Sequence, residues 1–231
     1  MKHTGKVKQY NKPSILSTVY FLLIALVVLS QLSNSLAWLN YIAKPILMPV
    51  LALFFIRSIT NYNKEVKGIL MALFCSWLGD VFLLFEPQHE LFFIAGLSAF
   101  LLAHLFYIFV FRYDVKGCGL LKSTPYIILG MLLCLGAFLY LLQPNLNELL
   151  LPVCVYAFII CGMLLVAILR YGQASQQSFR LCCFGALLFV LSDSIIAINK
   201  FLLPFDFAYP LIIVLYAVGQ YYIVKGLVVS S

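Results

Sequence analysis

Two aspartates stand inside long apolar segments of this chain, where a carboxylate is rarely placed for packing alone. Asp80 lies in the apolar run 74–84, and Asp193 lies in the run 187–196. A carboxylate at the centre of a membrane helix costs about 2.5 to 3.5 kcal/mol on insertion scales. Two neighbouring carboxyl groups in a poorly solvated site do not both ionise easily, so one can serve as general acid and the other as base. We therefore expect the chemistry of the chain at these two residues.

The segments that must position these carboxyls are long and apolar. The 231 residues are 64% hydrophobic and 10% charged, with a mean hydropathy of +1.05, whereas soluble domains are about half apolar and a quarter charged. Most of the apolar stretches are near the roughly 20 residues that span a bilayer. The sequence predicts an all-α polytopic membrane protein, a single transmembrane domain over residues 1–231 whose eight helices lie at 14–32, 36–59, 67–85, 91–111, 124–142, 149–170, 179–199 and 207–229.

The first apolar stretch has a second interpretation. It follows a Lys-rich start and is followed by Asn34, Ser35, Leu36 and Ala37, which together resemble a signal-peptide cleavage site. We favour a membrane-spanning helix, because the apolar run is long and its removal would leave an odd number of spans.

The formal net charge of +7 could suggest a nucleic-acid partner, but the positions of the charges indicate topology instead. With eight spans, most of the basic residues fall on one side of the membrane or at its edge. They are Lys2, Lys6, Lys8, Lys12, Arg57, Lys64, Lys67, Arg112, Lys116, Lys122, Arg170, Arg180 and Lys225. Lys200 is the only basic residue at the other boundary, whose loops hold Glu86, Glu90, Glu148 and Asp206. By the positive-inside rule both termini are cytoplasmic, and no nucleic acid is expected.

Three ionisable groups then share one layer of the membrane. At about 1.5 Å per residue, Asp80 lies about 8 Å below the outer end of its helix, Asp193 about 10 Å and Lys44 about 12 Å. Tyr156 falls at a similar depth and Tyr216 a little deeper. Helical spacing places further polar and small residues on shared faces, Gln220 with Tyr216 and a second stripe of Gly96, Phe100, His104 and Tyr107. These faces could line a single polar pocket open toward the outer leaflet.

The windows around the two aspartates share a pattern, Leu78-Gly79-Asp80 against Leu191-Ser192-Asp193. If helices one to four and five to eight form two parallel four-helix repeats, a pseudo-two-fold axis along the membrane normal would place Asp80 opposite Asp193.

Each of these residues also has a structural interpretation. An aspartate can pair with Lys44 in a purely structural ion pair, and Lys44 can extend its amine toward the interface. His104 can be a hydrogen-bonded interior histidine, and the tyrosines can be packing or interfacial aromatics. No Cys-x-x-Cys pair occurs among the seven cysteines, and His3, His89 and His104 are scattered, so no metal site or disulfide framework is indicated.

Taken together, the polar residues resemble those of the YhhN-like family of integral membrane proteins, whose characterised members are lysoplasmalogenases. The matching pieces cover helices two to eight: Lys44-Pro45 with Met48-Pro49, Leu78-Gly79-Asp80, Gly96-Leu97 followed by Phe100, His104 and Tyr107, Pro152-Val153 with Tyr156, Ser192-Asp193 with Asn199-Lys200, and Tyr216 with Gly219-Gln220.

The resemblance implies hydrolysis of the vinyl ether bond of a lysoplasmalogen to a fatty aldehyde and glycerophosphoethanolamine or glycerophosphocholine. Asp80 and Asp193 would then be the catalytic residues of a hydrolase without cofactor or metal. The expected partners are the lysophospholipid substrate and membrane lipids, and the expected location is a bacterial inner membrane. The residues expected to bind the substrate or position water are Lys44, His104, Tyr107, Tyr156, Asn199, Tyr216 and Gln220.

Two other functions fit the same pattern. A proton-coupled transporter of a small solute or lipid also uses carboxylates at membrane depth and parallel repeats. A receptor or lipid-binding scaffold would bind a lysolipid without turnover.

Overall fold

The computed structural model describes residues 15–32, 34–59, 62–117 and 125–230. Eight long helices lie in this part of the chain, and all are long and apolar enough to cross a membrane, as predicted. They are α1 (Ile15–Leu32), α2 (Trp38–Ser58), α3 (Lys64–Leu84), α4 (Glu90–Arg112), α6 (Pro125–Leu142), α7 (Leu150–Leu169), α8 (Gln176–Phe201) and α9 (Ala208–Ser230). Short 3-10 helices cover Asn34–Leu36, Glu86–Gln88, Gln143–Asn145 and Asn147–Leu149. The Lys-rich start, His3, Cys118 and Lys122 lie outside the described residues.

The helices form because apolar runs in a bilayer must satisfy their own backbone hydrogen bonds. Polar residues mark several beginnings: Asn63 Oδ1 accepts from the Val66 backbone N–H at the start of α3, and Ser175 Oγ accepts from the Ser178 N–H at the start of α8. Such caps satisfy N–H groups that have no partner within a helix.

Two prolines inside α2 create a further contact. Pro49 has no N–H, so the carbonyl of Pro45 loses its usual helical partner. The indole Nε1 of Trp77 on α3 donates to this carbonyl at 2.9 Å. The free carbonyl next to Lys44 thereby ties α2 to α3.

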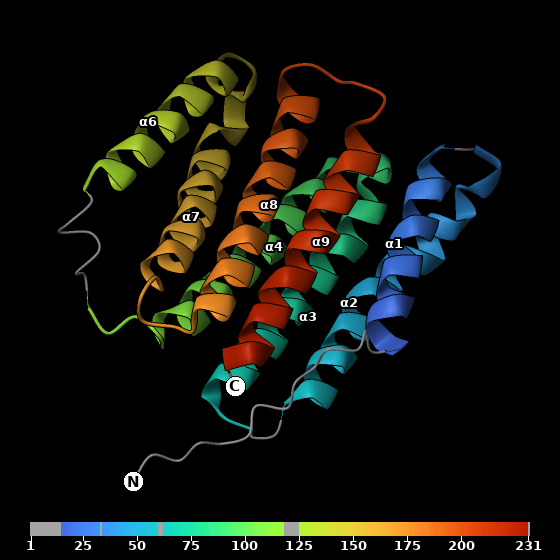
Figure 1. The fold of residues 1–231 in the computed structure, drawn as a ribbon. Coiled ribbons are helices and arrows are strands. Elements are labelled where there is room, and N and C mark those ends of the chain that lie inside the picture. Colours follow the sequence, from blue (N-terminus) through green and yellow to red (C-terminus); the bar gives the residue numbers. More distant parts are fainter. Residues whose placement is uncertain (1–14, 33, 60–61, 118–124, 231) are drawn as a thin grey trace, which may run out of the picture.

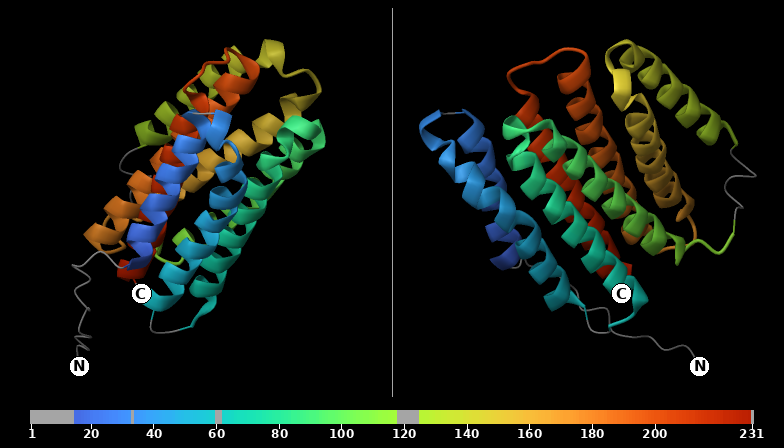
Figure 2. Two further views of the ribbon diagram at one scale, coloured as in Figure 1. Left: turned by 90° about the vertical axis from the view of Figure 1, so that its right-hand side faces the viewer. Right: turned by 180° about the vertical axis from the view of Figure 1, so that it is seen from behind.

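The helices pack as a bundle with α3, α4, α8 and α9 at its centre. Helices α1 and α2 pack against α9 and α3 on one side, and α7 packs against α4 and α8 on the other, with α6 outermost (Figures 1 and 2). Tyr20 of α1 is fully buried and donates to the Ala217 carbonyl of α9 at 2.9 Å, so the first helix is part of the packed bundle.

Glycines allow the central pairs to approach closely. A Cβ atom on Gly185 of α8 would lie 2.6 Å from the carbonyl oxygen of Gly219 on α9. On the other pair, a Cβ on Gly79 of α3 would lie 2.6 Å from the ring of Phe100 on α4. Close backbone approach through small residues is typical of helix pairs in membranes.

The packing follows the order that two parallel four-helix repeats would require. Helix α3 packs on α4 as α8 packs on α9, and α4 packs on α7 as α9 packs on α2. The first helices of the two halves differ in part: α1 packs on α2 as α6 packs on α7, but α1 also packs on α9, whereas α6 makes its other helix contact with α8. The contacts support the repeat hypothesis for the other six helices.

Charge is divided between the two ends of the bundle. Helix α1 begins and α9 ends at one end (Figure 1), where the basic residues Arg57, Arg112 and Arg180 also lie at helix termini. Glu86 and Glu90 lie at the other end, beyond α3 and at the start of α4. This division agrees with the charge pattern of the sequence, and the cytoplasmic location of the basic end stays a prediction.

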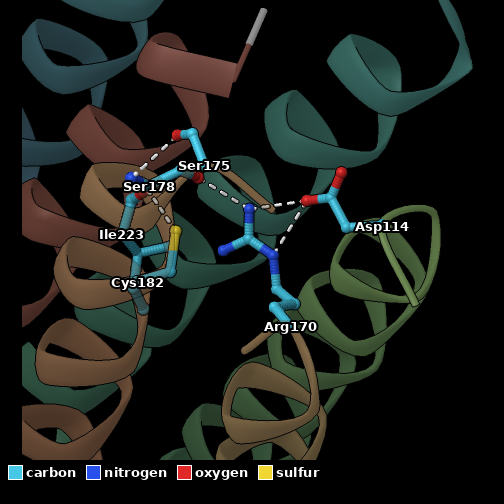
Figure 3. A network of polar contacts seen from close by, with 6 residues as sticks. All are labelled: Asp114, Arg170, Ser175, Ser178, Cys182 and Ile223. Atoms are coloured by element: carbon cyan, nitrogen blue, oxygen red, sulfur yellow. Dashed lines mark hydrogen bonds and ion pairs between the residues drawn. The ribbon is translucent and has the colours of Figure 1, made fainter. Parts of the chain in front are cut away.

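At the basic end, Arg170 forms a buried network of hydrogen bonds with Asp114 and Ser178. Its side chain is fully buried and binds Asp114 Oδ2 through Nε and Nη2 at 2.9 and 2.6 Å, while Nη2 also donates to Ser178 Oγ at 2.7 Å (Figure 3). Its guanidinium lies over the ring of Phe111. This network joins the end of α4 to the turn between α7 and α8. Helix α4 carries His104 and α8 carries Asp193, both nearer the other end of the bundle.

Candidate active site

Asp193 lies between α8, α7 and α4 with two polar neighbours. The Tyr156 hydroxyl of α7 donates a hydrogen bond to Asp193 Oδ2, and His104 Nε2 of α4 lies 4.0 Å from the same oxygen. The Asp193 side chain is 12% exposed, whereas His104 is fully buried. Among the described residues neither ring nitrogen of His104 has a hydrogen-bond partner. Both side chains therefore lie beside the same carboxyl oxygen.

Asp80 lies in a different polar group, between α3 and α9. The Tyr216 hydroxyl donates to Asp80 Oδ2 at 2.8 Å, and Asp80 is only 1% exposed. Below this pair, Gln220 Nε2 donates to Ser76 Oγ at 2.9 Å, and the Tyr107 hydroxyl donates to Gln220 Oε1 at 2.5 Å. Tyr107 and Gln220 thus belong to a buried column beneath Asp80.

Aromatic rings lie between the two groups. The Phe189 ring packs against the Tyr216 ring at a centroid distance of 5.3 Å and against the His104 ring at 4.6 Å. Phe100 packs against Tyr216 at 5.5 Å. The single polar pocket expected from depth is therefore two polar groups joined through aromatic side chains, because depth along a helix does not specify the direction in which a side chain points.

One cavity adjoins the Asp193 group, and a second cavity lies next to the first. An inner cavity of about 50 Å³ has a largely apolar wall that includes Asp193, Tyr156 and Phe100. An outer cavity of about 320 Å³ has a more polar wall that includes Lys44 and Asn199. Neither cavity is lined by Asp80. Both cavities are lined by Leu83, Phe93 and Ile196, so they are neighbours.

Lys44 and Asn199 both line the outer cavity, but they differ in their contacts with other residues. Lys44 makes no hydrogen bond or ion pair within 4.0 Å to any residue that the structure describes, so a direct Lys44–Asp80 ion pair is not formed. Asn199 Oδ1 accepts from the Phe205 backbone N–H at 3.1 Å, so this residue also stabilises the turn between α8 and α9. The outer cavity therefore contains a lysine with no carboxylate in contact.

The sequence did not point to several other residues of the outer cavity. In the sequence, Glu86 and Lys200 are mainly charges that indicate topology. In the structure they form an ion pair in the wall of the outer cavity. Asn40, Tyr41 and Tyr209 also line it. Asn40 could have been recognised, because it lies four residues before Lys44 and so on the same helical face.

Comparison with known proteins decides the family. The model of the YhhN family matches residues 39–227. This chain belongs to the YhhN family. Human lysoplasmalogenase TMEM86B is 30% identical over 190 residues, which cover 81% of this chain and 74% of the human protein. Mouse lysoplasmalogenase TMEM86B is 30% identical, and the match covers 88% of this chain and 79% of the mouse protein. Human lysoplasmalogenase TMEM86A is also 30% identical, and the match covers 81% of this chain and 78% of the human protein. No solved structure matches.

Family membership and the eight helices make the chain a multi-pass integral membrane protein. Within the described part of this YhhN-family chain, no three His, Cys, Asp or Glu side chains are grouped as metal ligands. The expectation of a reaction without metal or cofactor stays a prediction.

Proposed function

We propose that this protein is a lysoplasmalogenase, a hydrolase that cleaves the vinyl ether bond of a single-chain alkenyl glycerophospholipid. One observation carries the proposal: Asp193, bonded by Tyr156 and approached by His104, lies in the wall of a largely apolar cavity at membrane depth. The relatives named lysoplasmalogenase cover most of the chain and support this substrate class.

The reaction consumes one water. A proton is added to the alkene carbon distant from the ether oxygen, giving an oxocarbenium ion that water attacks to form a hemiacetal. The hemiacetal loses its bond to the glycerol oxygen, which takes up a proton, and the products are a fatty aldehyde and a glycerophospho-base. The enzyme therefore needs an acid for the carbon and a base for the water.

We assign unequal roles to the two aspartates. Asp193 is the acid, because it is the aspartate that lines the cavity, and after proton transfer its carboxylate stabilises the cation and accepts a proton from water. Tyr156 holds this carboxyl in place, and His104 lies beside it as a positioning residue, with Nε2 4.0 Å from the same oxygen and the ring outside the cavity lining. Asp80 is a positioning residue that acts through Tyr216 and the aromatic rings next to it.

The test is aldehyde release from lysoplasmalogens by purified protein in detergent, where no gradient can drive transport. We expect Asp193→Asn to lower kcat by about 10²- to 10⁴-fold, the usual contribution of a general acid. Asp80→Asn should lower activity less and leave the pH profile of the remaining activity unchanged. Glu148→Gln, at an exposed position of the 3-10 helix Asn147–Leu149, is the matched control. Absence of aldehyde from the unmutated protein with both ethanolamine and choline substrates would contradict the proposal.

A proton-coupled carrier is the second candidate, because the packing of α3 on α4 and of α8 on α9 resembles that of parallel repeats. A carrier would move a solute into sealed vesicles without chemical change, and this movement would be lost in detergent.

A further inference from the structure

The outer cavity is lined by polar side chains that have no role in the proposed cleavage of the vinyl ether bond. It lies at the end of the bundle where α3 ends and α4 begins, and it has a volume of about 320 Å³. Its polar lining comes from four elements, α1, α2, α8 and α9, and from the 3-10 helix after α3. These polar side chains are Gln31, Asn40, Tyr41, Lys44, Glu86, Asn199, Lys200 and Tyr209.

The inner part of this cavity is suited to an anion. Lys44 has no hydrogen bond or ion pair to a described residue, although Asp80 and Glu86 are near enough to interact with it electrostatically. Asn40 lies one turn earlier on the same face of α2, where its amide Nδ2 group can donate to an anion and its buried, unpaired Oδ1 atom needs a donor from the ligand. A charged group at membrane depth and an unpaired buried amide both cost free energy unless a ligand compensates them.

The outer part of the cavity is suited to a cation. Glu86 follows the end of α3 and is held by Lys200, while Tyr41 and Tyr209 line the same space with more than half of their surface exposed. Tyrosine faces and a carboxylate are the groups that recognise ammonium and quaternary ammonium ions. Lys44 lies six residues into α2, about 9 Å from the helix start. The positive group is therefore deep and the negative group shallow.

We propose that the outer cavity binds the zwitterionic phosphodiester head group of a single-chain phospholipid, with Lys44 at the phosphate and Glu86, Tyr41 and Tyr209 at the ammonium group. The order of charges matches, because the phosphate of such a head group is attached to the glycerol and the ammonium lies beyond it. Since the two cavities share Leu83, Phe93 and Ile196, the glycerol lies between the head-group site and Asp193.

This inference rests on the proposed function for its substrate, and it specifies what that substrate must carry. A head group with a net negative charge and no ammonium would bring a second negative charge to the Glu86–Lys200 pair and leave the Tyr41 and Tyr209 rings without a cation. An alkenyl glycerol without phosphate would leave Lys44 unpaired. The cavity therefore selects a phosphodiester with a terminal amine over both.

The kinetic experiment compares three substrates with one alkenyl chain: a lysoplasmalogen with ethanolamine or choline, the alkenyl glycerophosphate without a base, and the alkenyl glycerol. A charged hydrogen bond is worth about 1.5–3 kcal/mol, so Lys44→Gln should lower the kcat/KM ratio of lysoplasmalogen to alkenyl glycerol about ten- to hundredfold, mainly through KM. Lys44→Arg should restore part of the ratio. Glu86→Gln should lower the ratio of lysoplasmalogen to alkenyl glycerophosphate. Lys67→Gln, at the opposite end of the bundle, should change neither ratio.

An unchanged substrate ratio in Lys44→Gln, or an equal loss for all three substrates, would overturn the head-group site. A binding arm separates this result from failure of the enzyme proposal. Thermal stabilisation by a saturated alkyl lysophosphocholine, which has no vinyl ether, should be lost in Lys44→Gln even if no aldehyde is ever released. Equal stabilisation by inorganic phosphate and glycerophosphoethanolamine would show a simple phosphate site and overturn the zwitterion proposal.

Discussion

At the scale of single residues, the two aspartates have different surroundings despite their similar depth. Asp193 lines a cavity and is approached by a tyrosine and a histidine, whereas Asp80 is enclosed and held by Tyr216. Proton transfer to a substrate requires contact, so the exposed member of the pair is the better acid. The enclosed member can contribute only through the groups it orients.

His104 offers a test of function against packing. Its ring is fully buried and has no hydrogen bond to a described residue, although it lies 4.0 Å from Asp193. Replacing an unpaired buried polar group by an apolar group of similar shape is nearly neutral or stabilising. We expect His104→Phe to keep or raise the melting temperature in detergent while lowering kcat for aldehyde release at least tenfold. A clear loss of stability with unchanged kcat would assign His104 to packing.

At the scale of elements, the site depends on two tightly packed helix pairs. Asp80 is carried by the pair α3 and α4, and Asp193 by the pair α8 and α9. The approach of α8 to α9 brings Gly185 and Gly219 together, so that the backbones themselves are in contact. Ser192 Oγ also donates to the Ile212 carbonyl of α9 at 3.1 Å, next to Asp193.

Gly185→Ala should therefore separate α8 from α9. The added Cβ would lie 2.6 Å from the Gly219 carbonyl oxygen and 2.8 Å from the Ile223 backbone nitrogen, which only a backbone shift can relieve. Overpacking of this kind costs about 1–3 kcal/mol, so the melting temperature in detergent should fall. Gly130→Ala on α6 has no atom within 4 Å of its new Cβ and is the control. Equal melting temperatures for the two variants would contradict the close packing.

At the scale of the whole molecule, the bundle has an acidic end that carries the site and a basic end that carries the Arg170 network. The described helices alternate in direction, so α1 begins and α9 ends at the basic end (Figure 1). By the positive-inside rule, this charge division predicts that the site faces the outer leaflet of the membrane. The bacterial inner membrane stays a prediction.

Single cysteines in sealed cells test this orientation. Gln88 lies at the acidic end and Lys64 at the basic end. In a background whose seven native cysteines are replaced, Gln88→Cys should react with an impermeant thiol reagent from outside. Lys64→Cys should react only after the membrane is opened. Reaction of Lys64→Cys alone from outside would reverse the orientation.

The number of helices, their approximate ends and the depth of the aspartates could be predicted from the sequence. Each is a local property: about 20 apolar residues must form a helix in a bilayer, and a residue count measures depth. The charge division between the two ends also follows from counting spans. The same reasoning identified Asp80, Asp193 and the tyrosines as polar residues with no place in lipid.

Only the tertiary structure decided which of these residues meet. The direction of a side chain around its helix depends on which neighbours pack there, and the close pairs α3–α4 and α8–α9 turn Asp80 toward Tyr216 and Asp193 toward Tyr156. Packing also left Lys44 without a carboxylate in contact and brought Glu86 to the same cavity. Such proximity arises between helices far apart in the chain, so no spacing within one segment can show it.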